Sequence, residues 1–242
     1  MYHSVTFGNK NTWDDWHLIP ASRPVIAPPK HNSNMVTIPG MNGAVNISEV
    51  LTGYPTFANR TGSLQFYVAN DYWSRWDVAY STIMSYLHGQ SMRMVLEDDQ
   101  SYYYEGRFTV NQWQSGQTNS MITIDYDVYP YKRDFSTTDS DWLWDPFSFI
   151  DGEIRDWRNI TVNGDYSLIF EADPEPVVPK IIATIATGNT LTVEHRYNGV
   201  STVYTLEEGE NNIRGLVIRP GRNELIFSGR GTVTVGYRRG RF

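Results

Sequence analysis

Short runs in which apolar and polar residues alternate make up most of the chain, and clusters of Gly, Asn, Pro and Asp separate these runs. The clearest run covers residues 120–129 (SMITIDYDVY), where one set of residues alternates with another: Ile122, Ile124, Tyr126 and Val128 with Met121, Thr123, Asp125 and Asp127. Because successive side chains of a β-strand point to opposite faces, this period of two places one set in a core and the other toward solvent. The run therefore predicts a strand with one buried face.

Similar runs rich in Val, Ile, Thr and Tyr predict further strands in both halves of the chain. They cover residues 63–69, 91–96, 102–110, 160–162, 167–172, 180–186, 190–197, 201–206, 212–218, 223–228 and 231–237. Turn residues such as Asn198–Gly199 and Pro220–Gly221 separate several of them, and Gly229–Arg230–Gly231 predicts a hairpin turn between the last two. Short strands that recur about every 8–12 residues with turn signals between them are typical of a β-sandwich.

One segment, residues 70–89, has the period of a helix instead. Its large apolar residues recur at spacings of three and four and form one stripe: Trp73, Trp76, Tyr80, Ile83, Met84 and Leu87. Asn70 or Asp71 suits the N-cap, and Gly89 suits a left-handed stop. Packing against a sheet is favoured over a ligand platform for this stripe. The predicted fold class is therefore mainly β with one helix of about four turns.

Composition narrows the class of protein. The chain has 242 residues, which suits one or two domains at about 150 residues each. It contains no Cys, which excludes disulfide scaffolds, Fe–S clusters, thiolate zinc sites and cysteine nucleophiles. The net charge of −7 argues against a general nucleic-acid binder. The N-terminal residues lack the pattern of a signal peptide, and no apolar run approaches about 20 residues, so we expect no leader and no membrane insertion.

A domain boundary is predicted near residues 130–150, which divides the chain into domains 1–135 and 136–242. A strand ends there at Tyr129–Pro130, and the residues that follow turn acidic. Residues 136–176 hold 2 basic and 10 acidic side chains, a net −8, whereas residues 211–242 hold 7 basic and 1 acidic, a net +6. We expect the two blocks to approach each other within the second domain or between subunits. The basic end, residues 238–241, is expected to be solvated or to contact another subunit.

Residues able to support catalysis are present but form no known motif. The His residues show no metal-ligand spacing: His3, His17, His31, His88 and His195. Carboxylates cluster at Asp14–Asp15, Glu97–Asp98–Asp99, Asp125/Asp127 and Asp139/Asp141. The second cluster is interpreted as an acidic hairpin turn and the third as the polar face of one strand. We therefore predict a protein that is not an enzyme, with no catalytic, cofactor-binding or metal-ligating residue and no cofactor, and the sequence assigns no binding residue.

An ordered series of short motifs runs through the first half of the chain. It consists of Lys10–Asn11–Thr12, Asp14–Asp15, His17–Leu18, Pro28–Pro29, residues 36–43 (VTIPGMNG), Asn59–Arg60, the predicted helix with His88–Gly89, Glu97–Asp98–Asp99, residues 102–107 (YYYEGR), residues 122–125 (ITID) and residues 129–132 (YPYK). This series resembles the N-terminal domain of distal tail proteins (Dit) of long-tailed phages that infect Gram-positive bacteria. Residues 38–43 have the chemistry of a tight corner between strands, and Gly106 permits a bulge or a close backbone approach.

Motifs in the second half continue the series: residues 178–181 (VPKI), 213–218, 220–223 (PGRN), 229–231 (GRG) and 232–237. They resemble the second Dit domain, a galectin-like β-sandwich. Sugar-binding galectins use a cluster of His, Asn and Arg with a stacking Trp. This chain offers His195, Arg196 and Asn198 in one hairpin-like stretch but has no Trp after Trp157. Protein docking is therefore favoured over carbohydrate binding for this domain.

The resemblance implies both a fold and a function. The fold would be an N-terminal ring-forming domain, β-sandwich or β-barrel-like, followed by the galectin-like sandwich. The function would be that of a structural hub, a homohexameric ring that links the tail tube protein to the tail-tip or tail-associated lysin protein and anchors receptor-binding or baseplate proteins. DNA would only pass through the lumen. The protein would be made in the host bacterial cytoplasm and would lie at the distal end of the phage tail in the virion.

Two alternatives follow from the residues themselves. One is a carbohydrate-binding, lectin-like module that recognises host cell-wall polysaccharide through Trp142, Trp144 or Trp157. The other is a glycosidase that uses Glu97 or Asp99, because such enzymes need two carboxyl groups that face each other across a cleft.

Overall fold

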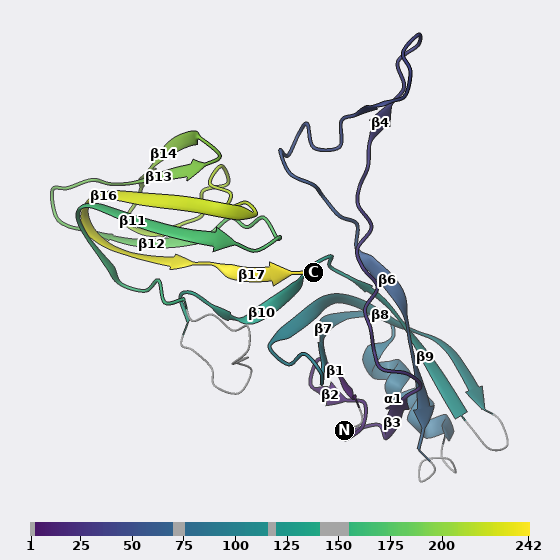
Figure 1. Cartoon of the computed structure of the whole chain (residues 1–242). Helices are drawn as coiled ribbons and strands as arrows, with labels where there is room; N and C mark the ends of the chain where they lie inside the picture. The colour runs from purple at the N-terminus through teal and green to yellow at the C-terminus, as the bar shows by residue number, and fades with distance from the viewer. Residues whose placement is uncertain (1–2, 70–75, 116–119, 141–154) are drawn as a thin grey trace. The chain divides into compact units, whose positions relative to one another are not determined.

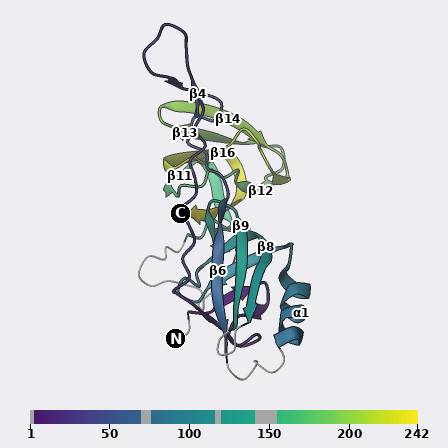
Figure 2. The same ribbon diagram turned by 90° about the vertical axis from the view of Figure 1, so that its right-hand side faces the viewer.

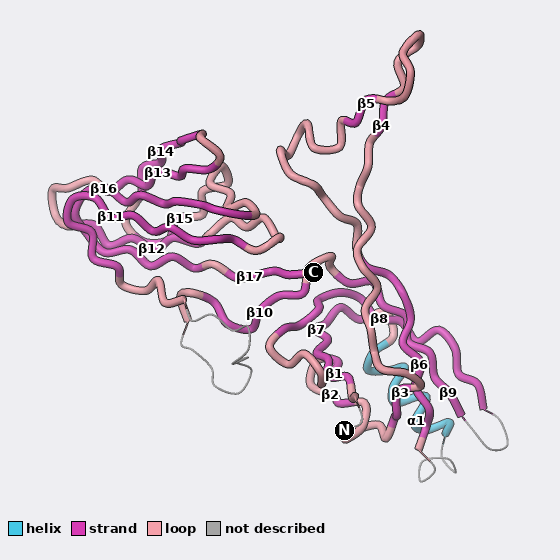
Figure 3. Tube along the Cα trace, viewed as in Figure 1, coloured by secondary structure: helices cyan, strands magenta, loops and turns pink. Residues whose placement is uncertain are grey.

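The computed structural model describes residues 3–69, 76–115, 120–140 and 155–242, and each of the two compact units of the chain is built mainly from β-strands (Figures 1 and 3). One unit comprises Met1–Lys132 together with Phe242, and the other comprises Arg133–Arg241. Within the described residues there is one helix, so the predicted fold class, mainly β with one helix, is confirmed.

The main sheet of the first unit is antiparallel, with strands in the order β2-β1-β7-β8-β9-β6-β3. The strands are β1 (Val5–Phe7), β2 (Lys10–Asn11), β3 (Leu18–Pro20), β6 (Arg60–Val68), β7 (Gln90–Leu96), β8 (Tyr102–Ser115) and β9 (Ser120–Val128). In β9 the predicted core face is confirmed, because Ile122, Ile124, Tyr126 and Val128 are all buried. They join one core cluster with side chains from the other long strands, such as Phe66 and Phe108. The opposite face is less open than predicted, since Thr123 is also buried and only Asp127 is exposed.

The backbone of β9 passes close to Gly106 of β8. A Cβ atom at this position would lie 2.2 Å from the carbonyl oxygen of Asp127 and 2.5 Å from Cα of Val128. Both are backbone atoms inside a paired ladder, so they cannot move aside as a side chain would. The prediction of a close backbone approach at Gly106 is confirmed.

The single described helix, α1 (Trp76–Leu87), contacts β8 (Figure 2). Ile83 and Leu87 are buried in the core, and the ring of Tyr80 meets that of Trp113 edge to face at 5.3 Å. The apolar stripe therefore packs on the sheet, as predicted. Gly89 has a φ of 72°, the left-handed conformation predicted for the helix stop. The predicted N-cap residues Asn70 and Asp71 and the stripe residue Trp73 lie outside the described residues.

The second unit contains a six-stranded antiparallel sheet in the order β14-β13-β16-β12-β15, with β11 paired to β16. Its strands are β11 (Ile160–Ala172), β12 (Lys180–Ile185), β13 (Leu191–Tyr197), β14 (Val200–Leu206), β15 (Gly209–Asn211) and β16 (Gly221–Gly236); β10 (Lys132–Thr137) pairs with β17 (Arg238–Arg241). Asn198 and Gly199, at φ 48° and 76°, form the two-residue turn predicted between β13 and β14.

Strand β16 (Gly221–Gly236) differs from the prediction for its residues. The sequence predicts two strands with a hairpin turn at Gly229–Arg230–Gly231, but β16 continues through these residues. Its first half pairs with β13 and its second half with β12, and the change of partner falls at these glycines. A Cβ at Gly229 would lie 2.1 Å from the backbone oxygen of Thr190, and one at Gly231 would lie 2.3 Å from that of Thr184. The glycines therefore let a continuous strand bend over the core rather than reverse.

The partner strand β11 bends with it, since Gly164 lies opposite Gly229 and has a φ of 94°. For this reason the two strands predicted at residues 160–162 and 167–172 form one strand. The prediction of a strand at residues 212–218 is wrong. A turn occurs there, closed by a hydrogen bond from the N–H of Leu216 to the carbonyl of Ile213, and Leu216 and Ile218 enter the core from a loop.

Candidate functional site: a projecting arm

A long segment of the first unit, residues 21–59, leaves the sheet and returns to it; we call it the arm (Figure 1). Its two limbs are joined by short stretches of hydrogen bonding. Strands β4 (Met35–Val36) and β5 (Val45–Asn46) pair over two residues each, and the N–H of Asn32 donates to the carbonyl of Thr56. Gly40 and Gly43, at φ 83° and 81°, form the corner predicted within residues 38–43.

The arm exposes an unusual number of large apolar side chains. Leu51 is 97% exposed, Val50 is 74% exposed and Val25 is 72% exposed. Four more join them along the arm: Met35, Val36, Ile38 and Met41. Exposed apolar surface of this kind marks a site of interaction with another molecule. No motif or period in the sequence marks this surface; residues 31–59 carry only one formally charged side chain, Glu49, and show neither strand nor helix periodicity.

The base of the arm is fixed to the sheet by Tyr126. The hydroxyl of Tyr126 accepts a hydrogen bond from the N–H of Ala27 at 2.9 Å, and Ile26 beside it is buried. The Tyr126 ring reaches this position by crossing Gly62, where a Cβ atom would lie 2.4 Å from the Tyr126 hydroxyl oxygen. The direction in which the arm starts therefore depends on a glycine in β6.

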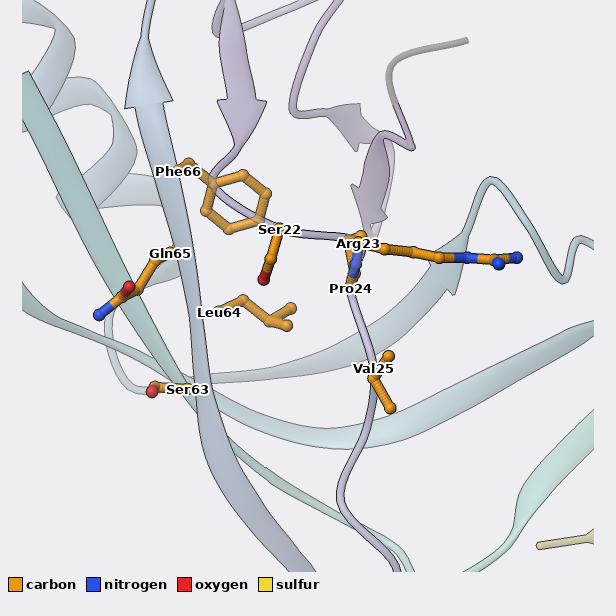
Figure 4. A pocket seen from close by; sticks show the side chains of 8 residues that line it. All are labelled: Ser22, Arg23, Pro24, Val25, Ser63, Leu64, Gln65 and Phe66. Carbon is orange, nitrogen blue, oxygen red and sulfur yellow. The ribbon is translucent and has the colours of Figure 1, made fainter.

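A cavity of about 450 Å³ opens where the arm leaves β6 (Figure 4). Residues 22–25 form one side and residues 63–66 of β6 the other. The N–H of Ala21 still donates to the carbonyl of Gln65, but Pro24 has no N–H and cannot continue the ladder. The outer edge of β6 is thereby left beside a space in which another extended segment can pair with it.

A second cavity, of about 620 Å³, lies at the arm base near the turn between β7 and β8. This turn is the predicted acidic hairpin turn, closed by a hydrogen bond from the N–H of Asp99 to the carbonyl of Leu96. Asp98 accepts hydrogen bonds from His3 and from Arg23, which lower the pKa of its carboxyl below the usual value, His3 contributing most. Asp99 pairs with Lys132 at 2.6 Å.

The glycosidase candidates sit in this turn and are engaged in structural contacts. Glu97 accepts a hydrogen bond from the N–H of Ser4 at 2.7 Å, while Asp99 binds Lys132. Neither carboxylate is held across a cleft from the other, because both belong to one tight turn. Nothing in this arrangement favours glycoside hydrolysis.

The galectin-like cluster of the second unit is divided between two faces of β13. His195 is buried, and its Nε2 lies 3.0 Å from Oδ1 of Asn223. Arg196, the next residue, is exposed and pairs with Glu194 at 2.6 Å. Asn198 belongs to the turn. The three residues therefore do not converge on one ligand, and no sugar site of that composition is formed by them.

The one described aromatic candidate for sugar stacking, Trp157, is likewise not presented to solvent. Trp157 is buried in the core of the second unit, where its ring lies 4.6 Å from that of Phe170 and 5.8 Å from that of Tyr237. Trp142 and Trp144 lie outside the described residues. The lectin-like alternative thus receives no support from the residues that can be placed.

The two charge blocks meet inside the second unit. Asp173 pairs with Arg239 at 2.7 Å and with Arg241 at 2.9 Å. Arg239 and Gly240 are buried in β17, so the prediction of a solvated basic end is wrong for them.

The described parts of the chain contain no cluster of three or more acidic or His side chains that could hold a metal ion. Among the same residues, no helix is long and apolar enough to cross a membrane.

Comparison with known proteins gives a match in structure only. No protein-family model matches the chain, and no curated protein matches its sequence. Among solved structures, the fold is similar to that of the SPP1 Dit protein (gp 19.1), described as a paradigm of the hub adsorption apparatus in phages that infect Gram-positive bacteria. The TM-score is 0.62 with 12% sequence identity, and the match covers 98% of each chain. The chain therefore has a Dit-like fold over both units.

Proposed function

We propose that this protein is the structural hub of a phage tail tip or baseplate. The observation that carries the proposal is the Dit-like fold, which extends over 98% of both chains. A match of that extent includes the arm as well as the two units, so it concerns the whole architecture rather than a common sandwich.

In this proposal the protein forms a homohexameric ring through domain 1–135. The arm supports self-association, because its exposed Leu51, Val50 and Val25 would leave water when a neighbouring subunit covers them. An arm on each copy that meets a different surface on the next copy makes a heterologous contact, and such contacts close into rings.

The ring would link the tail tube protein to the tail-tip or tail-associated lysin protein. Domain 136–242, a galectin-like sandwich in this proposal, would anchor receptor-binding or baseplate proteins. The net charge of −7 suits a lumen through which DNA passes without binding. The site of action would be the distal end of the tail in the virion, after synthesis in the bacterial cytoplasm.

Negative-stain microscopy of the purified protein, with light scattering on the same sample, tests the proposal. The expected result is a six-fold ring with a central hole and a mass of six chains. A monodisperse monomer across a wide range of concentration and salt would contradict it.

A further inference from the structure

The cavity of about 620 Å³ at the arm base combines apolar walls with a buried cation. Its walls come from prolines and aromatic and aliphatic side chains, among them Pro28, Pro29, Tyr104 and Leu96. Arg60, Arg23, Asp98 and Asp99 supply its charges; we call this cavity the Arg60 pocket.

The charges of the Arg60 pocket are not balanced equally. Asp98 has Arg23 and His3 as partners, and Asp99 has Lys132. Arg60 has no carboxylate partner among the described residues. Its guanidinium donates from Nε to the carbonyl of Pro130 at 2.7 Å and lies 5.6 Å from the ring centre of Tyr104.

Arg60 also retains hydrogen-bonding capacity. Arg60 is only 4% exposed, and its Nη2 is buried without a hydrogen-bond partner among the described residues. Burial lowers the pKa of this guanidinium below its usual value. A buried cation with an unsatisfied donor is costly, and a carboxylate is the group that best relieves it.

The arm carries the complementary group. Between Lys30 and Arg60, Glu49 is the only side chain with a formal charge. It is exposed, and the described residues include no ion-pair partner for it. The next two residues, Val50 and Leu51, are the most exposed apolar side chains of the arm. A carboxylate beside two apolar groups matches a pocket with one unpaired cation and apolar walls.

We propose that the Arg60 pocket of one subunit receives the Glu49–Val50–Leu51 segment from the arm of a neighbouring subunit, with the Glu49 carboxylate directed at Arg60. This inference rests on the proposed function, because it assigns a contact within the ring. The occupant is a second copy of the chain, since each surface lacks the group that the other supplies and both are present on every copy. A contact between two different surfaces of this kind is the type that closes a ring.

The absence of Cys makes a site-directed cross-link the direct test. One preparation carries Glu49→Cys and a second carries Val25→Cys, at an exposed position that lines the Arg60 pocket. The two are mixed, allowed to exchange subunits, and treated with a short bismaleimide. The expected product is a covalent dimer that contains one chain of each kind. The matched control replaces Val25→Cys with Ser81→Cys, on the exposed face of α1, and should give no such product.

A charge substitution tests the chemistry of the contact. Glu49→Gln should weaken assembly by about tenfold or more in a dilution series, whereas Glu171→Gln, at an exposed position of the second unit, should leave it unchanged. Six-fold rings that give no Glu49–Val25 product, or that tolerate Glu49→Gln, overturn this inference and leave the proposed function intact. Monomers under the microscope overturn the proposed function itself.

Discussion

Replacing Gly62 with Ala should damage the base of the arm, and the structure gives the size of the effect. A Cβ at this position would lie 2.4 Å from the hydroxyl oxygen and 2.7 Å from Cζ of Tyr126. Tyr126 is 4% exposed and packed in the core of the first unit, so its ring cannot turn into solvent. Overpacking of this kind costs about 1–3 kcal/mol. If the ring moves, the hydrogen bond to Ala27 is also lost, which adds about 1 kcal/mol.

A double-mutant cycle with Tyr126→Phe separates the two contributions. The phenylalanine has no hydroxyl, so it removes both the hydrogen bond and the closest contact with the new methyl group. We expect Gly62→Ala to cost about 2–4 kcal/mol and Tyr126→Phe about 1 kcal/mol. The double variant should be more stable than the sum of the single effects by about 1 kcal/mol or more, since the lost hydrogen bond is counted once and the contact between the new methyl group and the hydroxyl is removed.

Urea unfolding measures the three free energies, and hydrogen exchange at Ala27 reports the arm base directly. Ser63→Ala, on the same strand but exposed, serves as the control and should change stability by less than about 0.5 kcal/mol. Strict additivity of Gly62→Ala and Tyr126→Phe, or unchanged protection of the Ala27 amide in Gly62→Ala, would refute the reasoning.

Three further predictions concern the second unit and the arm. Asp173→Asn should destabilise the second unit by about 3 kcal/mol in thermal unfolding, because the buried Arg239 would lose its ion pair with Asp173; an unchanged Tm contradicts this. Val50→Ser should weaken self-association by about tenfold in sedimentation velocity, whereas Val200→Ser, similarly exposed at 68%, should not; equal effects would exclude the arm as the interface. Burial lowers the pKa of His195 below its usual 6.5, so the folded unit favours the neutral ring. The unfolded chain then takes up the proton first, and stability should fall as pH decreases below about 6.5; a pH profile unaltered by His195→Asn would contradict this.

Strand β9 and helix α1 could be predicted because each shows a regular apolar period within a short stretch of sequence. In β9 every second residue is apolar, and in α1 Ile83 and Leu87 lie one turn apart, so one buried face is sufficient to predict either element. The bend in β16 could not be predicted in the same way. Gly229 and Gly231 have the composition of a turn, and only the backbone oxygens that pack against them show that they lie within a strand.

The exposed apolar surface of the arm could not be predicted from the sequence for a different reason. A regular period of apolar residues arises where one face of an element packs on the core of the same chain. Residues 31–59 pack little of their side-chain surface against their own chain. Their apolar side chains alternate with no fixed period because no single core face orders them. What the sequence does contain is a long stretch with a single charge, Glu49. The first unit holds a buried cation, Arg60, whose Nη2 has no hydrogen-bond partner among the described residues. Neither residue stands out alone. Arg60 resembles any strand cation until its burial and its missing carboxylate are known, and Glu49 resembles any solvated loop residue until the neighbouring Leu51 is found to be 97% exposed.

An interface between copies of one chain is therefore recognised from two groups that each lack a partner within the chain. One is a buried cation, and the other is a carboxylate on an exposed apolar segment. Ten residues of irregular backbone separate these two groups in the sequence.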